Sequence, residues 1–214
     1  MSKVDLRLDW VGHDAAKFAV EHWHYSKTLP AFKALYVGVW EDRRYIGMIA
    51  FSPAMNPRLG VTYGLNQFEV CELVRVALDR HVTPVTRLVK IAIGILKRNS
   101  PGLRLIISYA DINQNHYGGI YQAGNWIYSG QTEDRRLKFA YLRSGRVYGW
   151  RAVSQIVHDK GLPSTVEGAE QCGFKPVPQL PKFIYLYPLD DDMRRQIEPL
   201  RKPYPKREPA NEAT

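Results

Sequence analysis

The sequence predicts an α/β fold with a mixed, mostly antiparallel central sheet and helices on both of its faces. Three observations predict it. The chain has 214 residues, which suits one sizeable domain with an insertion and is short for two. Apolar segments that alternate like strands are interleaved with segments of helical periodicity. Their order is strand, helix, hairpin, long strand, helix, strand, short helix, strand, insertion, strand, and this order favours helices packed on a sheet.

The first half of the chain is predicted to form a long antiparallel region and one amphipathic helix. In order, we expect a strand over 6–11, a helix over 12–25, hairpin strands over 34–42 and 44–54, a polar loop over 53–66 and a long apolar strand over 68–79. A helix over 86–99 follows. Thr83 is its expected N-cap and Pro84 its first residue, because proline suits the first helical position.

The second half is predicted to complete the sheet around an insertion. We expect a strand over 103–111, a short helix over 115–123 ending at Gly124, a strand over 126–132, a helix within 151–161 and a last strand over 183–189. A single domain would then span 1–192, with 133–180 as a basic insertion before the last strand. Residues 193–214 are rich in proline and basic residues and are predicted to be a tail.

The composition favours a polyanionic partner. The chain carries 30 Lys and Arg against 21 Asp and Glu, a net charge of +9, and nucleic acid is the commonest partner of such proteins. The segment 135–143 mixes basic and aromatic residues, as suits phosphates and unstacked bases. Two cysteines give no disulfide framework. No segment resembles a membrane span or a signal peptide, so we expect a cytoplasmic protein without a membrane partner.

The order of the elements is that of the N-acetyltransferase (GNAT) fold, which predicts an acyl-CoA cofactor. In that fold the two middle strands diverge, and the pyrophosphate of the cofactor rests on the N-terminus of the helix between them. The candidate cofactor-binding residues at this turn are Arg80, Thr83, Val85, Thr86 and Arg87. The glycine-rich motif of ordinary acetyltransferases is missing, and Pro84 removes one amide donor. A merely capped helix therefore remains the alternative.

Arg75 stands inside the long apolar strand. By two-residue alternation it shares a face with Leu73 and Ala77, whereas Glu72 points to the other face. A buried guanidinium is costly unless it is paired, so we expect it to meet a carboxylate or a substrate anion. A structural salt bridge and a functional role both remain open.

A polar cluster follows the strand over 103–111. Asp111 lies at the carboxyl end of that strand, where open α/β sheets bind their ligands. The neighbouring candidates are Ser108, Asn113, Asn115, His116 and Tyr117, and the pair Gly118-Gly119 allows close approach of the backbone. For Asp111 alone, a helix cap is the simpler explanation. The group as a whole predicts a site.

The segment EHWHYSKTLP at 21–30 concentrates chemically active side chains where the first helix should end. His22 is expected to be a core residue. His24 and Tyr25, together with Asp111, would make a mixed nitrogen and oxygen set suited to iron or another borderline cation. Without a metal, the same three residues would form a proton relay that activates a nucleophile. Both alternatives remain open.

Four segments carry a resemblance to a known family. HWHYSKTLP, GVWEDRRYIGMIAFSP, ELVRVALDRHVTPVTRLVKIAI and ISYADINQNHYGGIYQAGNWIYSGQT together resemble the Mom family of phage DNA-modification proteins, over about residues 15–132. The resemblance implies conversion of adenine in double-stranded DNA to N6-carbamoylmethyladenine, which shields phage DNA from host restriction. It also implies a reactive centre at His24, Tyr25 and Asp111 with Arg75 and Ser108 nearby, a possible iron, and an acyl-CoA donor. Acetyl-CoA has two carbons to give, but the amide nitrogen has no evident source.

The expected function is therefore a transferase that modifies adenine N6 in double-stranded DNA, in the host cytoplasm. The expected catalytic residues are Tyr25, Ser26, Arg75, Ser108 and Asp111, with His24, Tyr25 and Asp111 as the metal set. A flipped adenine would stack on Trp23, Tyr25, Tyr117 or Trp126. The expected substrate-binding residues are Asn113, Asn115, His116, Tyr117, Arg135, Arg136 and Arg143. The alternatives are an N-acetyltransferase for a small amine or a protein, and a non-catalytic basic nucleic-acid-binding module.

Overall fold

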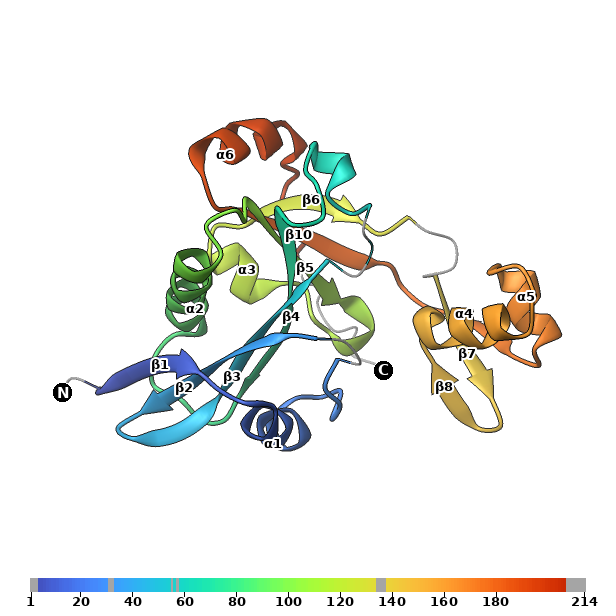
Figure 1. Cartoon of the computed structure of the whole chain (residues 1–214), viewed down its shortest axis with the longest axis horizontal. Helices are drawn as coiled ribbons and strands as arrows, with labels where there is room; N and C mark the ends of the chain where they lie inside the picture. The colour runs from blue at the N-terminus through green and yellow to red at the C-terminus, as the bar shows by residue number, and fades with distance from the viewer. Residues whose placement is uncertain (1–3, 31–32, 55, 57, 134–137, 207–214) are drawn as a thin grey trace, which may run out of the picture. The chain divides into compact units, whose positions relative to one another are not determined.

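The computed structural model describes residues 4–30, 33–54, 56, 58–133 and 138–206 (Figure 1). Its strands are β1 Leu6–Trp10, β2 Leu35–Glu41, β3 Arg44–Pro53, β4 Val70–Leu78, β5 Leu105–Asp111, β6 Ile127–Gln131, β7 Phe139–Arg143, β8 Arg146–Tyr148, β9 Lys175–Pro178 and β10 Lys182–Pro188. Its α-helices are α1 His13–Trp23, α2 Val85–Asn99, α3 Gly119–Ala123, α4 Trp150–Asp159, α5 Val166–Gln171 and α6 Asp191–Ile197. Short 3₁₀ turns lie at Val61–Tyr63, Ile112–Gln114 and Glu198–Leu200.

The chain divides into two compact units. Unit 1 comprises Met1–Tyr109, Gly118–Ser129 and Tyr185–Tyr204, and unit 2 comprises Ala110–Tyr117, Gly130–Ile184 and Pro205–Thr214. The predicted boundary between domain and tail at residue 192 falls inside helix α6. Beyond this helix, the Lys202 amide donates to the Tyr128 carbonyl and the Tyr204 hydroxyl to the Trp126 carbonyl. This first part of the predicted tail therefore belongs to unit 1.

The main sheet has seven strands in the order β1-β2-β3-β4-β5-β10-β6. The pairs β1–β2, β2–β3 and β3–β4 are antiparallel, whereas β4 and β5 are parallel and joined through α2. Helices α1 and α2 lie on opposite sides of strands β2–β4 (Figure 1). This architecture confirms the predicted mixed, mostly antiparallel sheet with helices on both faces, as in the N-acetyltransferase fold.

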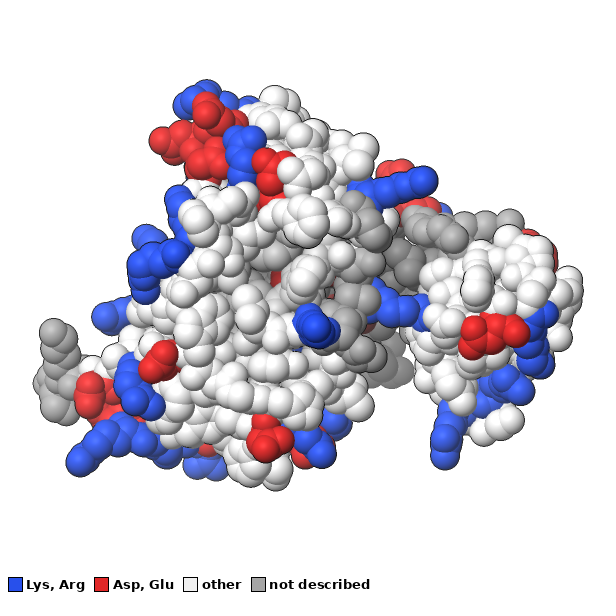
Figure 2. Space-filling model, in the orientation of Figure 1, with Lys and Arg blue, Asp and Glu red and all other residues white. Residues whose placement is uncertain are grey.

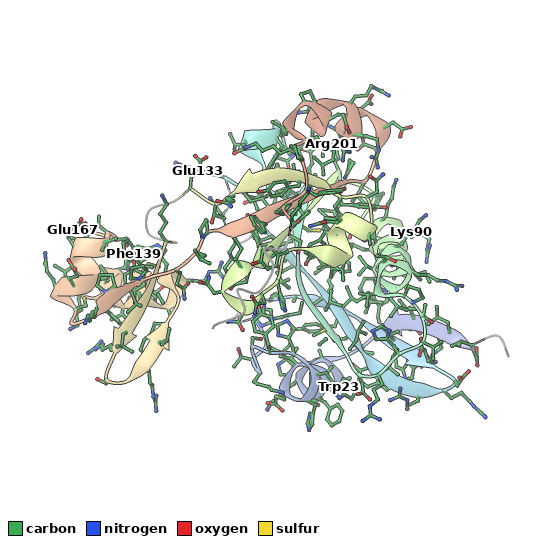
Figure 3. The ribbon with its side chains drawn as sticks, turned by 180° about the vertical axis from the view of Figure 1, so that it is seen from behind. Trp23, Lys90, Glu133, Phe139, Glu167 and Arg201 are labelled. Carbon is green, nitrogen blue, oxygen red and sulfur yellow. The ribbon has the colours of Figure 1, made fainter. Side chains whose placement is uncertain are left out.

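Helix α1 packs on the hairpin through small side chains. Ala16, Ala19 and Val20 are fully buried and contact Met48 and Ala50 of β3 in one apolar cluster. Small residues on the helix let its backbone approach the sheet closely. Trp23, labelled in Figure 3, closes this cluster at the end of the helix. The packing fixes where α1 ends, and with it the position of the predicted reactive segment.

A β-bulge in β4 reverses part of the predicted side-chain alternation. Ala50 pairs with Arg75 and Phe51 pairs with Leu73, so Val74 is an extra residue in the ladder. Paired residues share a face of the sheet, so Arg75 lies on the Ala50 side, which α1 covers.

The bulge corrects two expectations about Arg75. Ala77 pairs with Met48 and does share the face of Arg75, as predicted. The predicted common face with Leu73 is wrong. Glu72 pairs with Ser52, two residues from Ala50, and so shares the face of Arg75, contrary to expectation. The prediction counted the alternation of side chains along β4 without the extra residue Val74.

Strands β4 and β5 diverge just beyond their first three pairs. Regular pairing runs from Val70–Leu105 to Glu72–Ile107 and then stops, although both strands continue. The next residue along β5 spans the gap with its side chain, because the Ser108 hydroxyl donates to the Leu73 carbonyl over 2.8 Å. This is the divergence expected of an acetyltransferase-like sheet.

Unit 2 contains a smaller sheet and a core of its own. Strands β7, β8 and β9 form an antiparallel sheet in the order β8-β7-β9. Its buried cluster consists of Tyr141, Val153, Val157, Ala169, Cys172 and Phe174, and Phe139, labelled in Figure 3, packs against it. The sequence predicted α4 but not this sheet. Among the described residues, no helix is long and apolar enough to cross a membrane.

The glycine pair at the start of α3 gives a stability prediction. Gly118 has φ +80°, and a Cβ there would lie 2.2 Å from the Tyr185 ring, whereas a Cβ at Gly119 would meet nothing within 4 Å. Gly118→Ala should therefore lower the free energy of unfolding by about 2–5 kcal/mol, from strained backbone and overpacking. Gly119→Ala, the matched control, should change it by less than about 1 kcal/mol. Urea unfolding measures both, and equal effects would contradict this account.

Candidate functional site

The turn after α1 holds His24 in one tautomer. Helix α1 ends at Trp23, two residues before the predicted end, and His24 is its C-cap. The Ser26 amide donates to His24 Nδ1 over 3.1 Å, and the Ser26 hydroxyl lies 2.8 Å from the same atom. A backbone N–H can only donate, so Nδ1 is an acceptor and the neutral ring carries its proton on Nε2. Ser26 is therefore a positioning residue for His24.

The two histidines of this segment differ in burial. His22 is exposed, stacks on Phe18 with ring centroids 4.1 Å apart, and contacts the Phe18 carbonyl through Nδ1. His24 is buried, with 9% of its surface exposed. The expectation that His22 belongs to the core is wrong, because α1 ends one residue before His24 and the chain turns that ring inward.

Tyr25, Arg75, Ser108 and Tyr121 come together within unit 1. Tyr25 interacts electrostatically with both Arg75 and Tyr121, and its ring lies 4.3 Å from that of His24. Tyr25 is 49% exposed, so solvent and ligands reach its phenol. The hydroxyls of Ser108 and Tyr121 are 2.7 Å apart. Since Ser108 donates to the Leu73 carbonyl, Tyr121 is the donor in this second bond. Burial raises the pKa of Tyr121 to about 12.

Arg75 is a cation with unused hydrogen-bonding capacity. Its Nη1 donates to the Val74 carbonyl over 2.7 Å, and its buried Nε has no acceptor among the described residues. No carboxylate in that part of the chain forms an ion pair with it. Burial lowers the pKa of the guanidinium, and the nearby Tyr25 opposes the shift. Arginine still stays charged at neutral pH. The arrangement therefore favours an external anion or carbonyl oxygen over a structural salt bridge.

The turn before α2 already holds an anion of the protein itself. The Glu41 carboxylate accepts hydrogen bonds from the Val82 and Thr83 amides over 2.8 and 2.7 Å. Burial opposes its ionisation, but the bonds from Thr83 and Val82 prevail and keep the pKa of Glu41 below the ordinary 4.5. The helix N-cap is Pro84 and not Thr83, and the first helical residue is Val85. The Thr83 amide is therefore bound to Glu41 and not available to a cofactor. Of the predicted cofactor contacts, those in the first turn of α2 remain available.

A cavity of about 500 Å³ opens between β3, β4 and α2, and a second of about 440 Å³ lies beside α2. The first is mainly apolar and contains none of the predicted site residues. The second is lined by Thr86, Arg87, Lys90, Trp126, Tyr187 and Arg194 among others, and Lys90 is labelled in Figure 3. Three cations beside a helix N-terminus make this second cavity attractive to phosphates. Arg80 is exposed and does not line it.

Asp111 belongs to unit 2 and is engaged there. Its Oδ1 accepts from the backbone and side-chain nitrogens of Asn113 over 3.1 and 2.9 Å, and its Oδ2 lies 3.3 Å from Lys182 Nζ. Burial opposes ionisation, but the charge of Lys182 and the Asn113 hydrogen bonds prevail, so the pKa of Asp111 is lowered. A carboxylate of this kind is a weak general base and a good partner for a cation. Its predicted meeting with His24 and Tyr25 of unit 1 stays a prediction.

The remaining predicted substrate contacts lie in or near unit 2. Asn113 exchanges two hydrogen bonds with the Leu180 backbone, so its amide cannot contact a base without breaking them. Asn115 and His116 are exposed, and the Tyr117 ring lies 6.0 Å from that of Phe183. Arg143 is at the end of β7. Arg135 and Arg136 lie outside the described residues. Trp126 is buried against Tyr121, which confirms its core alternative.

The family follows from comparison with known proteins. The model of the Mom protein family matches residues 5–206. The chain belongs to the Mom protein family. It is also similar to the methylcarbamoylase mom of Escherichia phage Mu, with 26% identity over 133 residues, which are 60% of this chain and 55% of that protein. The match thus spans about half the length of the phage Mu relative.

A solved structure shows a more distant likeness. It is that of a "Putative Acetyltransferase" from Acinetobacter baylyi ADP1, with a TM-score of 0.48 and 11% sequence identity, and it covers 89% of this chain and 95% of that one. The fold assignment of this Mom family member rests on its own strand order and register.

Two of the three predicted iron ligands already have partners within the protein. Among the described residues, no group of three or more His, Cys, Asp and Glu side chains is placed to hold a metal ion. Both Asp111 oxygens have partners, and His24 Nδ1 accepts from Ser26. Ligation by Asp111 would break its ion pair with Lys182. We therefore derive no chemical step through a metal in this Mom family protein.

Sequence reasoning missed several residues of the site. Tyr121 completes the hydrogen-bond network of Ser108, and its one sequence signal was its place two residues after the Gly118-Gly119 pair. Ser52, 2% exposed, has a buried hydroxyl without a partner among the described residues, on the same sheet face as Arg75. Glu41 and Lys182 are far in sequence from their partners, so no local pattern in a Mom family sequence points to them.

The Glu41 contact predicts a pH-dependent loss of stability in Glu41→Gln. The folded-state pKa of Glu41 lies below the ordinary 4.5, so ionised Glu41 stabilises the fold above about pH 4.5 and the contribution is lost as the pH falls through the folded value. At pH 7 the variant should lose about 1–3 kcal/mol of unfolding free energy, as for hydrogen bonds to a charged group. Below the folded pKa the difference should shrink. Glu21→Gln, an exposed control on α1, should show neither effect in unfolding curves.

Proposed function

We propose that the protein is a DNA-modification enzyme that adds a carbamoylmethyl group to the N6 amino group of adenine in double-stranded DNA. Membership of the Mom family supports it, as does the name of the phage Mu relative, methylcarbamoylase. The observation that carries the proposal is the half-buried Arg75 guanidinium, with no acceptor for its Nε, beside an accessible Tyr25. A cation left unpaired in this way is typical of a site that awaits a ligand.

Transfer of a group to adenine N6 requires activation of this amine. The N6 lone pair of adenine is delocalised into the ring, and an enzyme that acts on it within a duplex must first extrude the base. In the proposed roles, Tyr25 acts as the phenolate, beside the positive charge of Arg75, and takes the N6 proton. His24 orients the Tyr25 ring that lies against it. Ser26 fixes the tautomer of His24 through its amide. Arg75 donates from Nε to the oxygen of the incoming group, where negative charge develops.

Asp111 is proposed to complete the reactive centre through its charge. Its lowered pKa keeps it ionised at neutral pH, so it would stabilise a developing cation and not accept the proton itself. Ser108 and Tyr121 are proposed as positioning residues, because their hydrogen-bond chain ends on the Leu73 carbonyl where β4 and β5 diverge.

An acyl-CoA is the proposed donor. The basic cavity beside α2 fits its phosphates, with Arg87, Lys90 and Arg194 as counter-charges and the first turn of α2 as amide donors. When bound, the acyl-CoA would supply the two carbons of the added group. Acyl transfer alone would give N6-acetyladenine, so attachment through the methylene carbon and the amide nitrogen require a second, nitrogen-bearing donor. We further propose that the protein acts on duplex DNA in the host cytoplasm and protects phage DNA from restriction. Membership of the Mom family and the net charge of +9 support this part of the proposal.

The first test is the modified base itself. DNA from cells that express the protein should yield, after digestion to nucleosides, a deoxyadenosine whose mass is increased by that of a carbamoylmethyl group in mass spectrometry. DNA from cells expressing no protein is the control. If folded protein accumulates and no adenine adduct appears, the proposed function is wrong. Release of free CoA with a small amine and without DNA would support the N-acetyltransferase alternative instead.

A second test separates chemistry from DNA binding. Tyr25→Phe should lower the rate of adduct formation by roughly 100-fold or more, the scale of general acid–base catalysis, and leave DNA affinity unchanged. Asp111→Asn should also lower the rate, because the charge that stabilises the developing cation is lost. His22→Ala is the matched control, because His22 lies on the same segment but is exposed on the outer side of α1. If His22→Ala reduced activity as much as Tyr25→Phe, the assignment of the reactive turn would be wrong.

A further inference from the structure

The β7–β8 hairpin of unit 2 places two arginines directly opposite each other. Arg143 pairs with Arg146 across the two strands, at the pair next to the turn. Directly opposed side chains in an antiparallel pair approach closely, and like charges in such positions are destabilising. Among the described residues, neither arginine forms an ion pair with a carboxylate. The described part of the chain therefore keeps two positive charges together without a carboxylate beside them.

The hairpin holds these arginines in a defined position. Its two-residue turn, Ser144-Gly145, has positive φ values of 50° and 75°, the backbone of a tight hairpin turn. The Arg143 guanidinium lies 5.1 Å from the Phe174 ring centroid, and Phe174 is part of the buried core of the unit. A cation that stacks on an anchored aromatic ring loses little further freedom when it binds an anion.

A third cation lies at the same end of this sheet. Lys175 pairs with Leu142, one position from Arg143, and is exposed on the opposite face. The strands β7, β8 and β9 contain no acidic residue, so the charged side chains of these strands are all basic. In Figure 2, Lys and Arg side chains stand at the β7–β8 end of unit 2.

We propose that the tip of the β7–β8 hairpin is a phosphate clamp that grips the backbone of double-stranded DNA. The inference rests on the proposed function, which takes duplex DNA as substrate. Arg143 and Arg146 each contact a phosphate, and the DNA supplies the counter-charge that relieves their repulsion. A two-stranded ribbon also has the width that the major groove of DNA admits. The clamp positions the duplex and takes no part in the transfer chemistry.

The test is the salt dependence of DNA binding by the full-length protein. Fluorescence anisotropy with a labelled duplex, over a series of sodium chloride concentrations, gives the slope of log affinity against log salt. In Arg143→Gln with Arg146→Gln, the magnitude of that slope should fall by about 1.8, or about 0.9 for each phosphate contact removed. The charge-retaining double variant Arg143→Lys with Arg146→Lys should keep most of the slope.

The matched control removes two exposed arginines of unit 1. Arg58→Gln with Arg98→Gln lowers the net charge by the same amount and should leave the slope unchanged. An equal fall in this control would show that net charge and not the hairpin is responsible, and would overturn the clamp. Circular dichroism and the unfolding midpoint should match the wild type in all variants; a glutamine variant that unfolds is replaced by the single change Arg146→Gln, with an expected fall of about 0.9.

The outcomes separate the clamp from the proposed function. If the wild-type protein forms the adenine adduct but the glutamine variant keeps the wild-type slope, the clamp is wrong and the function stands. If the slope falls as expected, the clamp stands, and the DNA concentration that gives half-maximal adduct formation should rise in the glutamine variant, because the clamp binds the substrate. A wild-type protein without salt-dependent affinity for duplex DNA would overturn both.

Discussion

The bulge at Val74 is the constraint on which the site in unit 1 depends. It adds one residue to β4 and so brings Arg75 onto the face that α1 covers. Without it, regular alternation would place the guanidinium with Leu73, on the side away from Tyr25. The same stretch of β4 marks where pairing with β5 ends, and Ser108 spans the opening by its bond to the Leu73 carbonyl. One backbone irregularity thus sets both the charge and the gap of the site.

The sequence predicted the element order well, because strand alternation and helical periodicity are local patterns. Arg75 was found for the same reason, since a charge inside an apolar strand stands out. Its facing was mispredicted because a bulge depends on pairing with β3, which no local pattern reports. His22 was wrongly expected in the core because the buried face of α1 is formed by Ala16, Ala19 and Val20 and does not include it. The small sheet of unit 2 was missed because its three strands are short and two helices separate β8 from β9.

The polar residues of the site divide into those that hold structure and those left available. Asp111 and Asn113 tie their loop to Lys182 and Leu180, so the simple explanation of Asp111 as a cap was correct in part. Arg75 and Ser52 have buried polar atoms that the described protein atoms do not satisfy. Buried groups in this state are uncommon in folded proteins and concentrate where a ligand completes them. The unsatisfied atoms therefore locate the site more sharply than the conspicuous loop does.

The position of β10 in the sheet has a consequence for how the chain folds during synthesis. β10 lies between β5 and β6, although the ribosome produces β6 and all of β7, β8 and β9 before it. Until residue 188 emerges, β5 and β6 each lack a neighbour, and the nascent sheet presents two open edges. Closing such long-range pairs is slow, because the entropy of a long loop must be overcome first. If the intervening unit folds first around its own core, the two ends of this insertion come closer together. The entropic cost of pairing β10 with β5 and β6 is then lower.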